Sequence, residues 1–324
     1  MVNLYISSLY DGEPPYEGHL ASLISGLAKN HLFHCSLNQA DSALLLDYQP
    51  QKLRSLIGRG IPRNRRFLVI REPQQVHPSA YKDKYLGQFG KVFRMGHCLS
   101  EKVEYPWAYD EPKGWEKYFS RKERNHSVAV AVASWRFSLI KGSYYQLRNE
   151  IYRLQNIHLY GFGWDDDWIK KAKEVLKQVV TGIKNFKILS PAPLFDANSY
   201  KVMGLGRVGD KLETLSNYKV SLVIENSGDY FSEKLFDAIY AGCIPVYVGP
   251  SIAALGLDSN LVIQAEPNVL SISQGVEKAL ALPRDEWANN MLSVIRAGKF
   301  SDWNSNHSWL KIANVVAREL SAPR

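Results

Sequence analysis

The sequence predicts an α/β protein of two domains with a cleft, each domain built on a parallel sheet covered by helices. Its length of 324 residues is greater than that of a domain with one ordinary hydrophobic core, and it suits two domains of about 150 residues each. Short aliphatic runs alternate with helix-like stretches in both halves, a pattern typical of parallel sheets covered by helices on both faces. Hydrophobic residues make up 45% and charged residues 22% of the chain, so we expect packed globular domains rather than disorder.

The first half of the chain supplies the first set of alternating elements. A helix-like stretch spans 19–29, with apolar side chains three and four residues apart. A second helix-like segment, 144–155, closes this half, and we place the domain boundary near its end, giving domains 1–155 and 156–324. The strand-like runs are 4–6, 44–46, 67–70, 92–93 and 128–133.

The second half repeats the alternation. Its strand-like runs are 158–160, 222–224, 245–248 and 261–263. At the C-terminus, residues 309–320 carry apolar side chains at near-helical spacing. We expect a terminal amphipathic helix there that packs back on the first domain.

The net charge of +8, from 40 basic and 32 acidic residues, favours anionic partners. Part of this charge lies between positions 52 and 66. One interpretation is an ordinary solvated surface, and the other is a patch that contacts an acceptor lipid or a membrane surface. No zinc-finger spacing, RNP-like run or basic recognition helix accompanies the charge, so we expect no nucleic-acid partner. The basic residues are Lys52, Arg54, Arg59, Arg63, Arg65 and Arg66.

The cysteines and the N-terminus indicate the compartment. Cys35, Cys98 and Cys243 are odd in number and far apart, which favours neither a disulfide framework nor a thiolate zinc site. The N-terminus lacks a basic region and a long apolar core, and no window reaches the eighteen or so apolar residues that a membrane helix needs. We therefore expect a cytoplasmic protein.

The segment 220–249 carries most of the chemistry. A buried strand ends in Glu225 and Asn226, and polar groups at the carboxyl end of a parallel strand face the crevice where such sheets bind ligands. Ser232 is a credible N-cap for the helix that follows, and Gly242 suits its C-terminal end. A second strand at 244–248 completes a βαβ unit.

The start of this helix suits a ligand with both phosphate and hydroxyl groups. A helix N-terminus attracts anions, and Lys234 adds a full positive charge there. The adjacent Glu233 would accept hydrogen bonds from two vicinal hydroxyls of a ribose or a sugar ring. The alternative is an ordinary capped helix start in which Glu233 complements the dipole and Lys234 is solvated.

The same segment resembles the donor-binding signature of the α-1,3/1,4-fucosyltransferase family (glycosyltransferase family 10), here most similar to soluble bacterial members. Residues 218–227 read YKVSLVIENS, 229–234 read DYFSEK and 241–249 read AGCIPVYVG. Ile224 replaces the usual Phe before Glu-Asn, and Phe231-Ser232 replaces Val-Thr, both conservative changes. The resemblance implies that Glu225, Asn226, Tyr230, Glu233 and Lys234 bind the donor.

Two upstream features extend the resemblance. Residues 133–135 (ASW), 147–152 (LRNEIY) and 159–163 (LYGFG) resemble the family block in which an Arg heads a hinge helix. Arg148 would then bind the donor diphosphate, which its planar fork suits; the alternative is a solvated helix arginine. Glu72 follows the strand 67–70 and precedes Pro73, and the family has an acidic residue at this position. The resemblance implies that Glu72 is the catalytic base. Its alternative is a salt pair with Arg71 or another basic residue.

The resemblance implies a GT-B arrangement in which two Rossmann-like domains face each other across a cleft, with an acceptor domain before residue 155 and a donor domain after it. It implies inverting transfer of L-fucose from GDP-L-fucose to a GlcNAc or Glc hydroxyl of an oligosaccharide or glycolipid, in bacterial surface-polysaccharide synthesis or protein glycosylation, in the cytoplasm or peripherally at the inner membrane. No cofactor and no metal are expected, although Asp165-Asp166-Asp167 offers an alternative metal site. Other GDP- or UDP-linked sugars, and a non-catalytic nucleotide- or glycan-binding protein, remain as alternatives.

Overall fold

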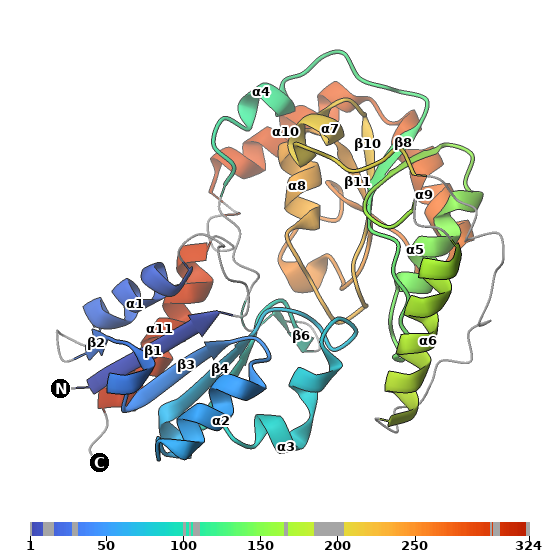
Figure 1. The fold of residues 1–324 in the computed structure, drawn as a ribbon. Coiled ribbons are helices and arrows are strands. Elements are labelled where there is room, and N and C mark those ends of the chain that lie inside the picture. The colour runs from blue at the N-terminus through green and yellow to red at the C-terminus, as the bar shows by residue number, and fades with distance from the viewer. Residues whose placement is uncertain are drawn as a thin grey trace. The chain divides into compact units, whose positions relative to one another are not determined.

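The chain folds into two compact units, each built on a parallel sheet (Figure 1). The first comprises 1–97, 103–110 and 301–324, and the second comprises 98–102 and 111–300. The computed structural model describes residues 2–8, 16–27, 32–99, 102–103, 105, 111–164, 168–184, 204–298, 300 and 305–321.

The first unit contains a five-stranded sheet in the order β2-β1-β3-β4-β5, with every pairing parallel. β3 and β4 are buried throughout because helices cover both faces of the sheet. The sequence pattern indicated four of these strands but not β2, whose three residues are too few to show a period. The strands are β1 (Val2–Ser8), β2 (Leu32–His34), β3 (Ser42–Leu46), β4 (Arg66–Ile70) and β5 (Lys91–Arg94).

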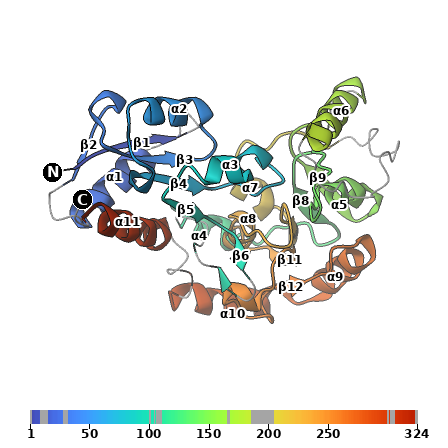
Figure 2. The same cartoon turned by 90° about the horizontal axis from the view of Figure 1, so that it is seen from below.

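Alternate residues of these strands point to two hydrophobic layers. Leu44 and Leu46 face one layer, which α1 (Tyr16–Leu27) and the C-terminal helix α11 (Ser305–Ser321) complete. Ala43 and Leu45 face the other layer, on the side of α2 (Pro50–Gly58) and α3 (Asp83–Leu86). From α11, Trp309, Ile312, Val316 and Leu320 are buried in the first layer, so the end of the chain packs in the first unit beside α1 (Figures 1 and 2).

The second unit contains a five-stranded parallel sheet in the order β12-β11-β10-β8-β9. Together the two sheets confirm the predicted α/β class with two Rossmann-like units. The strands are β8 (Ala129–Val132), β9 (Ile157–Tyr160), β10 (Val220–Ile224), β11 (Ile244–Val248) and β12 (Ile263–Gln264), and the short pair β6 (Cys98–Leu99) and β7 (Lys102–Val103) precedes them.

The change from the first to the second unit comes earlier than the boundary expected at residue 155. β8 pairs with β9 along its length and with β10 at Val130, so it belongs to the second sheet. An aliphatic run shows that a strand exists but not which sheet it joins, because partners are fixed by tertiary pairing. The segment expected to end the first domain therefore lies within the second unit.

Helices flank the second sheet, and α9 packs against β11 and β12 (Figure 2). They are α4 (Glu116–Phe119), α5 (Tyr145–Glu150), α6 (Trp168–Lys184), α7 (Lys211–Ser216), α8 (Lys234–Tyr240), α9 (Val269–Ala281) and α10 (Arg284–Arg296). Single 3-10 turns lie at Leu37–Gln39, Arg63–Arg65, Pro78–Tyr81, Ile151–Arg153 and Ala253–Leu255. Within the part of the chain that the structure describes, no helix combines the length and hydrophobicity that crossing a bilayer requires.

Only some residues of the basic cluster between positions 52 and 66 are exposed to solvent. Lys52 and Arg54 are exposed on α2. Arg66, in contrast, is buried at the start of β4, and Arg65 donates to the Leu320 carbonyl of α11 at 3.1 Å. Arg63 donates to the Phe89 carbonyl at 3.1 Å. Contact of this cluster with a membrane stays a prediction that rests on its exposed members.

Candidate functional site

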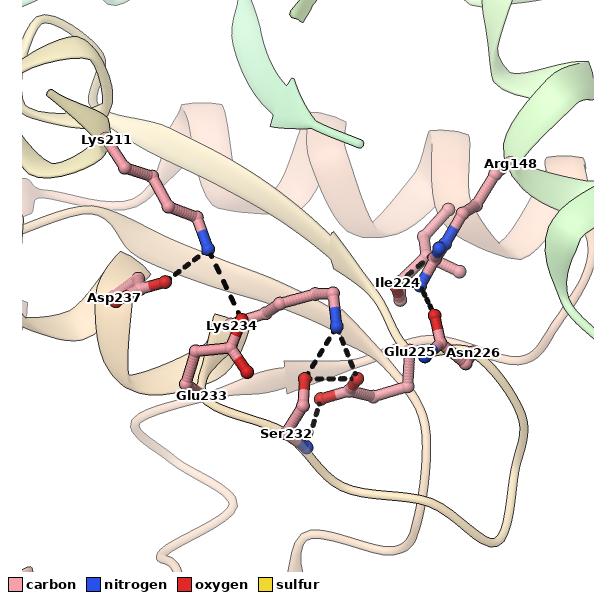
Figure 3. Close-up of polar contacts among 9 residues, drawn as sticks. All are labelled: Arg148, Lys211, Ile224, Glu225, Asn226, Ser232, Glu233, Lys234 and Asp237. Atoms are coloured by element: carbon pink, nitrogen blue, oxygen red, sulfur yellow. Dashed lines mark hydrogen bonds and ion pairs between the residues drawn. The ribbon is translucent and has the colours of Figure 1, made fainter. Parts of the chain in front are cut away.

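The centre of the candidate site is the carboxyl end of β10, where Glu225 follows the last strand residue. Its side chain is 0% exposed and accepts three hydrogen bonds (Figure 3). Oε1 accepts from the Ser232 backbone N–H at 3.0 Å, and Oε2 accepts from the Ser232 hydroxyl at 2.7 Å and from Lys234 Nζ at 3.3 Å. Glu225 thus anchors the turn before α8, and its predicted contact with a donor stays a prediction.

The predicted N-cap at Ser232 is wrong. α8 begins at Lys234, Glu233 is its N-cap residue, and the Glu233 carbonyl accepts the first helical bond from the Asp237 N–H at 3.0 Å. The Ser232 hydroxyl instead donates a hydrogen bond to Glu225, because a fully buried carboxylate without donors would be strongly destabilising. The burial of Glu225 cannot be read from the sequence.

Lys234 extends over this turn. Its Nζ donates to the Ser232 hydroxyl oxygen at 2.7 Å as well as to Glu225, and 22% of its side chain is exposed. The ammonium group is therefore held at the strand end, with part of its surface open to a ligand. A freely solvated lysine, the alternative considered above, does not describe this geometry.

Arg148 of α5 lies at the same strand end and is only 4% exposed. Its Nε and Nη2 donate to the Ile224 carbonyl at 3.0 and 2.5 Å, and Nη2 also donates to Asn226 Oδ1 at 2.8 Å (Figure 3). Burial lowers the pKa of the guanidinium, although Tyr145 and Glu225 act in the opposite direction. The solvated-arginine alternative is thus wrong, since this is a buried cation.

The hydrogen-bonding partners of Arg148 are all neutral. Among the described residues it takes part in no ion pair within 4 Å, whereas Lys234 is paired with Glu225. An anion placed beside Arg148 would therefore gain a strong charge-assisted contact without breaking an existing pair. Asn226 fixes the orientation of the guanidinium.

Glu233 carries the carboxylate expected to accept ligand hydroxyls. Its side chain is 34% exposed, and Oε1 lies 3.8 Å from Lys211 Nζ (Figure 3). Burial alone would raise the pKa of this carboxyl, but Lys234, Lys211 and Arg148 outweigh that effect, so the pKa is lowered. The group is thus an anionic acceptor at neutral pH.

Lys211 is a member of the cluster that the sequence analysis missed. It is the first residue of α7, and its Nζ binds both the Asp237 carboxylate and Glu233 (Figure 3). Neither Lys211 nor Asp237 belongs to a recognisable motif for this chemistry. They meet only because α7 and α8 pack together, which no local pattern reveals.

Tyr230 and Gly249 are two further residues of the segment 220–249. The Tyr230 ring is 1% exposed, and its predicted contact with a donor stays a prediction. At Gly249 a Cβ would lie 2.9 Å from Glu225 Cγ and would clash with the Tyr247 hydroxyl. Local steric crowding therefore explains why the last residue of the 241–249 motif is a glycine.

In the first unit, Glu72 follows β4 at the carboxyl edge of the sheet and is half-buried. Its backbone carbonyl accepts from the Tyr81 hydroxyl at 2.8 Å. The preceding Arg71 forms a buried pair with Asp47, with Nε at 2.7 Å from Oδ2 and the backbone N–H at 2.8 Å from Oδ1. Asp47, missed in the sequence, has a left-handed φ of 65°. The role of Glu72 as a base stays a prediction.

The triplet Asp165-Asp166-Asp167 lies outside the described residues. Within the described ranges, no group of three or more His, Cys, Asp or Glu side chains could hold a metal ion.

Comparison with known proteins identifies the fold. No protein-family model matches the chain. A putative fucosyltransferase-like protein of Arabidopsis thaliana is 40% identical over 77 residues, which cover 21% of this chain and only 15% of that protein's length. HepE of Anabaena, solved in complex with UDP and glucose, superposes with a TM-score of 0.53 at 13% identity, covering 98% of this chain and 100% of HepE.

Two further solved structures are similar. A UDP-forming trehalose-phosphate synthase from Burkholderia xenovorans has a TM-score of 0.51 at 13% identity, covering 95% of this chain and 79% of its own. An α1,3-fucosyltransferase has a TM-score of 0.48 at 14% identity, covering 90% and 81%. The matches above 0.5 show that the chain has the GT-B-like fold with two parallel α/β sheets, as predicted.

Proposed function

We propose that this protein is a glycosyltransferase that binds a nucleotide-sugar donor at the carboxyl end of β10. The observation that carries the proposal is Arg148, a buried guanidinium with only neutral hydrogen-bond partners, held at this strand end in a GT-B-like fold. Ligands of open α/β sheets bind outside the carboxyl ends of the strands. A diphosphate supplies the negative charge that Arg148 lacks among its neighbours.

The other groups of the cluster suit the rest of such a donor. Lys234, partly exposed, adds a second positive charge for the diphosphate. Glu233, one-third exposed and anionic, accepts hydrogen bonds from two hydroxyls of a ribose or sugar diol. Phosphate and diol recognition from adjacent residues favours a nucleotide sugar over a simple phosphate ester.

GDP-L-fucose is the donor we propose. The support is the motif across residues 218–249, with the sequence match to the Arabidopsis fucosyltransferase-like protein. The acceptor would be a GlcNAc or Glc hydroxyl of an oligosaccharide or glycolipid. In this proposal the second unit holds the donor, the first unit holds the acceptor, and the enzyme works in the cytoplasm or at the inner membrane surface.

The proposed reaction is a single inverting displacement. The Glu72 carboxylate takes the proton of the acceptor hydroxyl, whose oxygen attacks the anomeric carbon of the sugar. The bond from that carbon to the diphosphate breaks, and the electron pair leaves with GDP. Arg148 and Lys234 stabilise the charge that develops on the leaving diphosphate.

The test is transfer by the purified full chain from GDP-L-fucose to a panel of GlcNAc- and Glc-containing acceptors, followed by mass spectrometry and linkage analysis. We expect a fucosylated product with an α-1,3 or α-1,4 linkage. Glu72→Gln should lower kcat by roughly 100- to 10,000-fold, the usual contribution of a general base, with unchanged donor affinity. Full activity of Glu72→Gln would overturn the base assignment.

A second candidate donor is a UDP-linked hexose. The observation favouring it is the full-length similarity to HepE, which was solved with UDP and glucose. Calorimetric titration with GDP and UDP distinguishes the two bases, and turnover of several GDP- and UDP-sugars distinguishes the sugars. Tight nucleotide binding without transfer to any acceptor or donor hydrolysis would instead indicate a non-catalytic nucleotide-binding protein.

A further inference from the structure

Lys211 connects α7 to the charged turn before α8. The start of α7 is itself fixed, because the Asp210 side chain accepts from the Glu213 N–H at 3.0 Å and from the Tyr118 hydroxyl at 2.6 Å. From this anchored position the ammonium group of Lys211 lies between two carboxylates, bound to Asp237 and 3.8 Å from Glu233. The lysine is therefore held by both the fold and its charge partners.

The two carboxylates need such a cation. Glu233 and Asp237 are four residues apart around the start of α8, the spacing at which like charges repel on a helix. The Asp237 side chain is only 10% exposed, so water screens it poorly. Without Lys211, two anions would lie beside the groups that we propose bind a diphosphate.

We infer that Lys211 is a positioning residue of the nucleotide-sugar site: it places the Glu233 carboxylate for the diol of the donor and offsets the repulsion of the diphosphate by Glu233 and Asp237. The inference rests on the proposed function. It assigns Lys211 no contact with the ligand, because its two observed ion-pair partners are both carboxylates of the protein.

The charges around Glu233 predict a signature in the pH dependence. Lys234, Lys211 and Arg148 favour its anion, whereas burial disfavours it, and Asp237 and Glu225 are the nearby acidic groups. Removal of Lys211 takes away one favourable charge and exposes Glu233 to Asp237. The pKa of Glu233 should then rise, so that the anion is lost at a higher pH than in the wild type.

The test is calorimetric titration of Lys211→Met, Lys211→Arg and wild type with the intact sugar nucleotide, GDP-L-fucose or the UDP-sugar, from pH 5 to 8. Both phosphates of such a donor are esterified, so they do not titrate in this range. We expect Lys211→Met to bind roughly 10-fold more weakly at pH 7.5, a difference of about 1.4 kcal/mol, and to weaken further toward pH 5. Lys211→Arg should stay within about 3-fold of wild type because it keeps the charge.

A matched control and a second-site variant make the result specific. Lys278→Met removes an exposed lysine of α9 outside the cluster and should leave affinity unchanged. In Lys211→Met/Asp237→Asn the repelling carboxylate is gone as well, so most of the affinity should return. If Lys211→Met folds poorly, the affinity of this double variant can be compared with that of the wild type instead.

Two results would overturn the inference while leaving the proposed function intact. One is a Lys211→Met variant with wild-type affinity and pH profile. The other is a fall in affinity that is uniform from pH 5 to 8 and is not restored in the double variant, as a merely structural role would give. Failure of the wild type to bind any sugar nucleotide would overturn the proposed function, and the inference with it.

Discussion

Two buried arginines of the second unit, Arg124 and Arg148, differ in how completely their donors are used. Arg124 makes five hydrogen bonds to backbone carbonyls, from Nε, Nη1 and Nη2, and these acceptors come from three separate parts of the unit. Burial lowers its pKa to about 10. Because carbonyls of its own unit engage all three nitrogens, Arg124 has a structural role.

Arg148 is more deeply buried but donates hydrogen bonds to the described residues only from Nε and Nη2, to Ile224 and Asn226. Its Nη1 makes no hydrogen bond to a described residue, so this nitrogen is available to a ligand. A guanidinium whose three nitrogens all bind backbone carbonyls holds the fold together, whereas one with an unengaged nitrogen at a strand end can bind an anion. Burial alone does not separate these roles.

The largest effect is expected from Arg124→Met. The substitution leaves carbonyls of Tyr118, Tyr218 and Ala241 without this donor, and each buried acceptor left unsatisfied costs about 1–3 kcal/mol. We expect a large loss in the free energy of unfolding, measured by urea denaturation, with the donor affinity of the remaining folded protein little changed. A loss below about 1 kcal/mol would show that Arg124 is not a structural centre.

Arg148→Met should show the opposite balance. Because a charged partner of the ligand is removed, donor binding should weaken by about 2–5 kcal/mol, or at least 30-fold, in calorimetric titration. Arg148→Lys should recover only part of this loss, since an ammonium lacks the planar fork that spans the Ile224 carbonyl and Asn226. Equal donor affinity of Arg148→Met and wild type would contradict the anion-binding role.

Glu225→Gln should have an intermediate effect. The amide keeps the shape of the side chain but loses the charge that holds Lys234 and the second acceptor for Ser232. We expect a loss of about 1–3 kcal/mol in the free energy of unfolding and a several-fold loss of donor affinity. Thermal unfolding and titration on the same sample give both values, and a change in neither would remove Glu225 from the site.

The smallest effect concerns pH in the wild type. A carboxyl with a lowered pKa is anionic above that pKa and becomes protonated only as the pH falls through it, and the pKa of Glu233 is shifted below its usual value of 4.5. Donor affinity should therefore stay flat from pH 8 to 5, as measured by titration with the intact sugar nucleotide. A midpoint near pH 6 would show that Glu233 is not held as an anion.

The sequence predicted the elements of the site better than their contacts. β10 and β11 follow from the aliphatic runs, and the helix between them follows from the spacing of its apolar residues and from Gly242 at its C-terminal end. Arg148 and Lys234 were candidates from the sequence motif alone, because a motif is defined by residue types and their spacing, which the sequence contains. What lay beyond prediction depends on tertiary packing.

Three differences illustrate this limit. Ser232 bonds to Glu225 rather than capping α8, because a buried carboxylate competes for its hydroxyl. Lys211 joins the site only through the packing of α7 on α8. β8 belongs to the second sheet because it pairs with β9 and β10, which its four residues of aliphatic sequence do not specify.

The most direct measurement is calorimetric titration of the wild type and Arg148→Met with the nucleoside, its monophosphate and its diphosphate, in the guanosine and uridine series. If Arg148 and Lys234 bind the diphosphate, one series should show at least a 10-fold gain from monophosphate to diphosphate in the wild type, or about 1.4 kcal/mol. That gain should largely disappear in Arg148→Met. Equal affinity for the mono- and diphosphate, or no binding in either series, would contradict the proposed site.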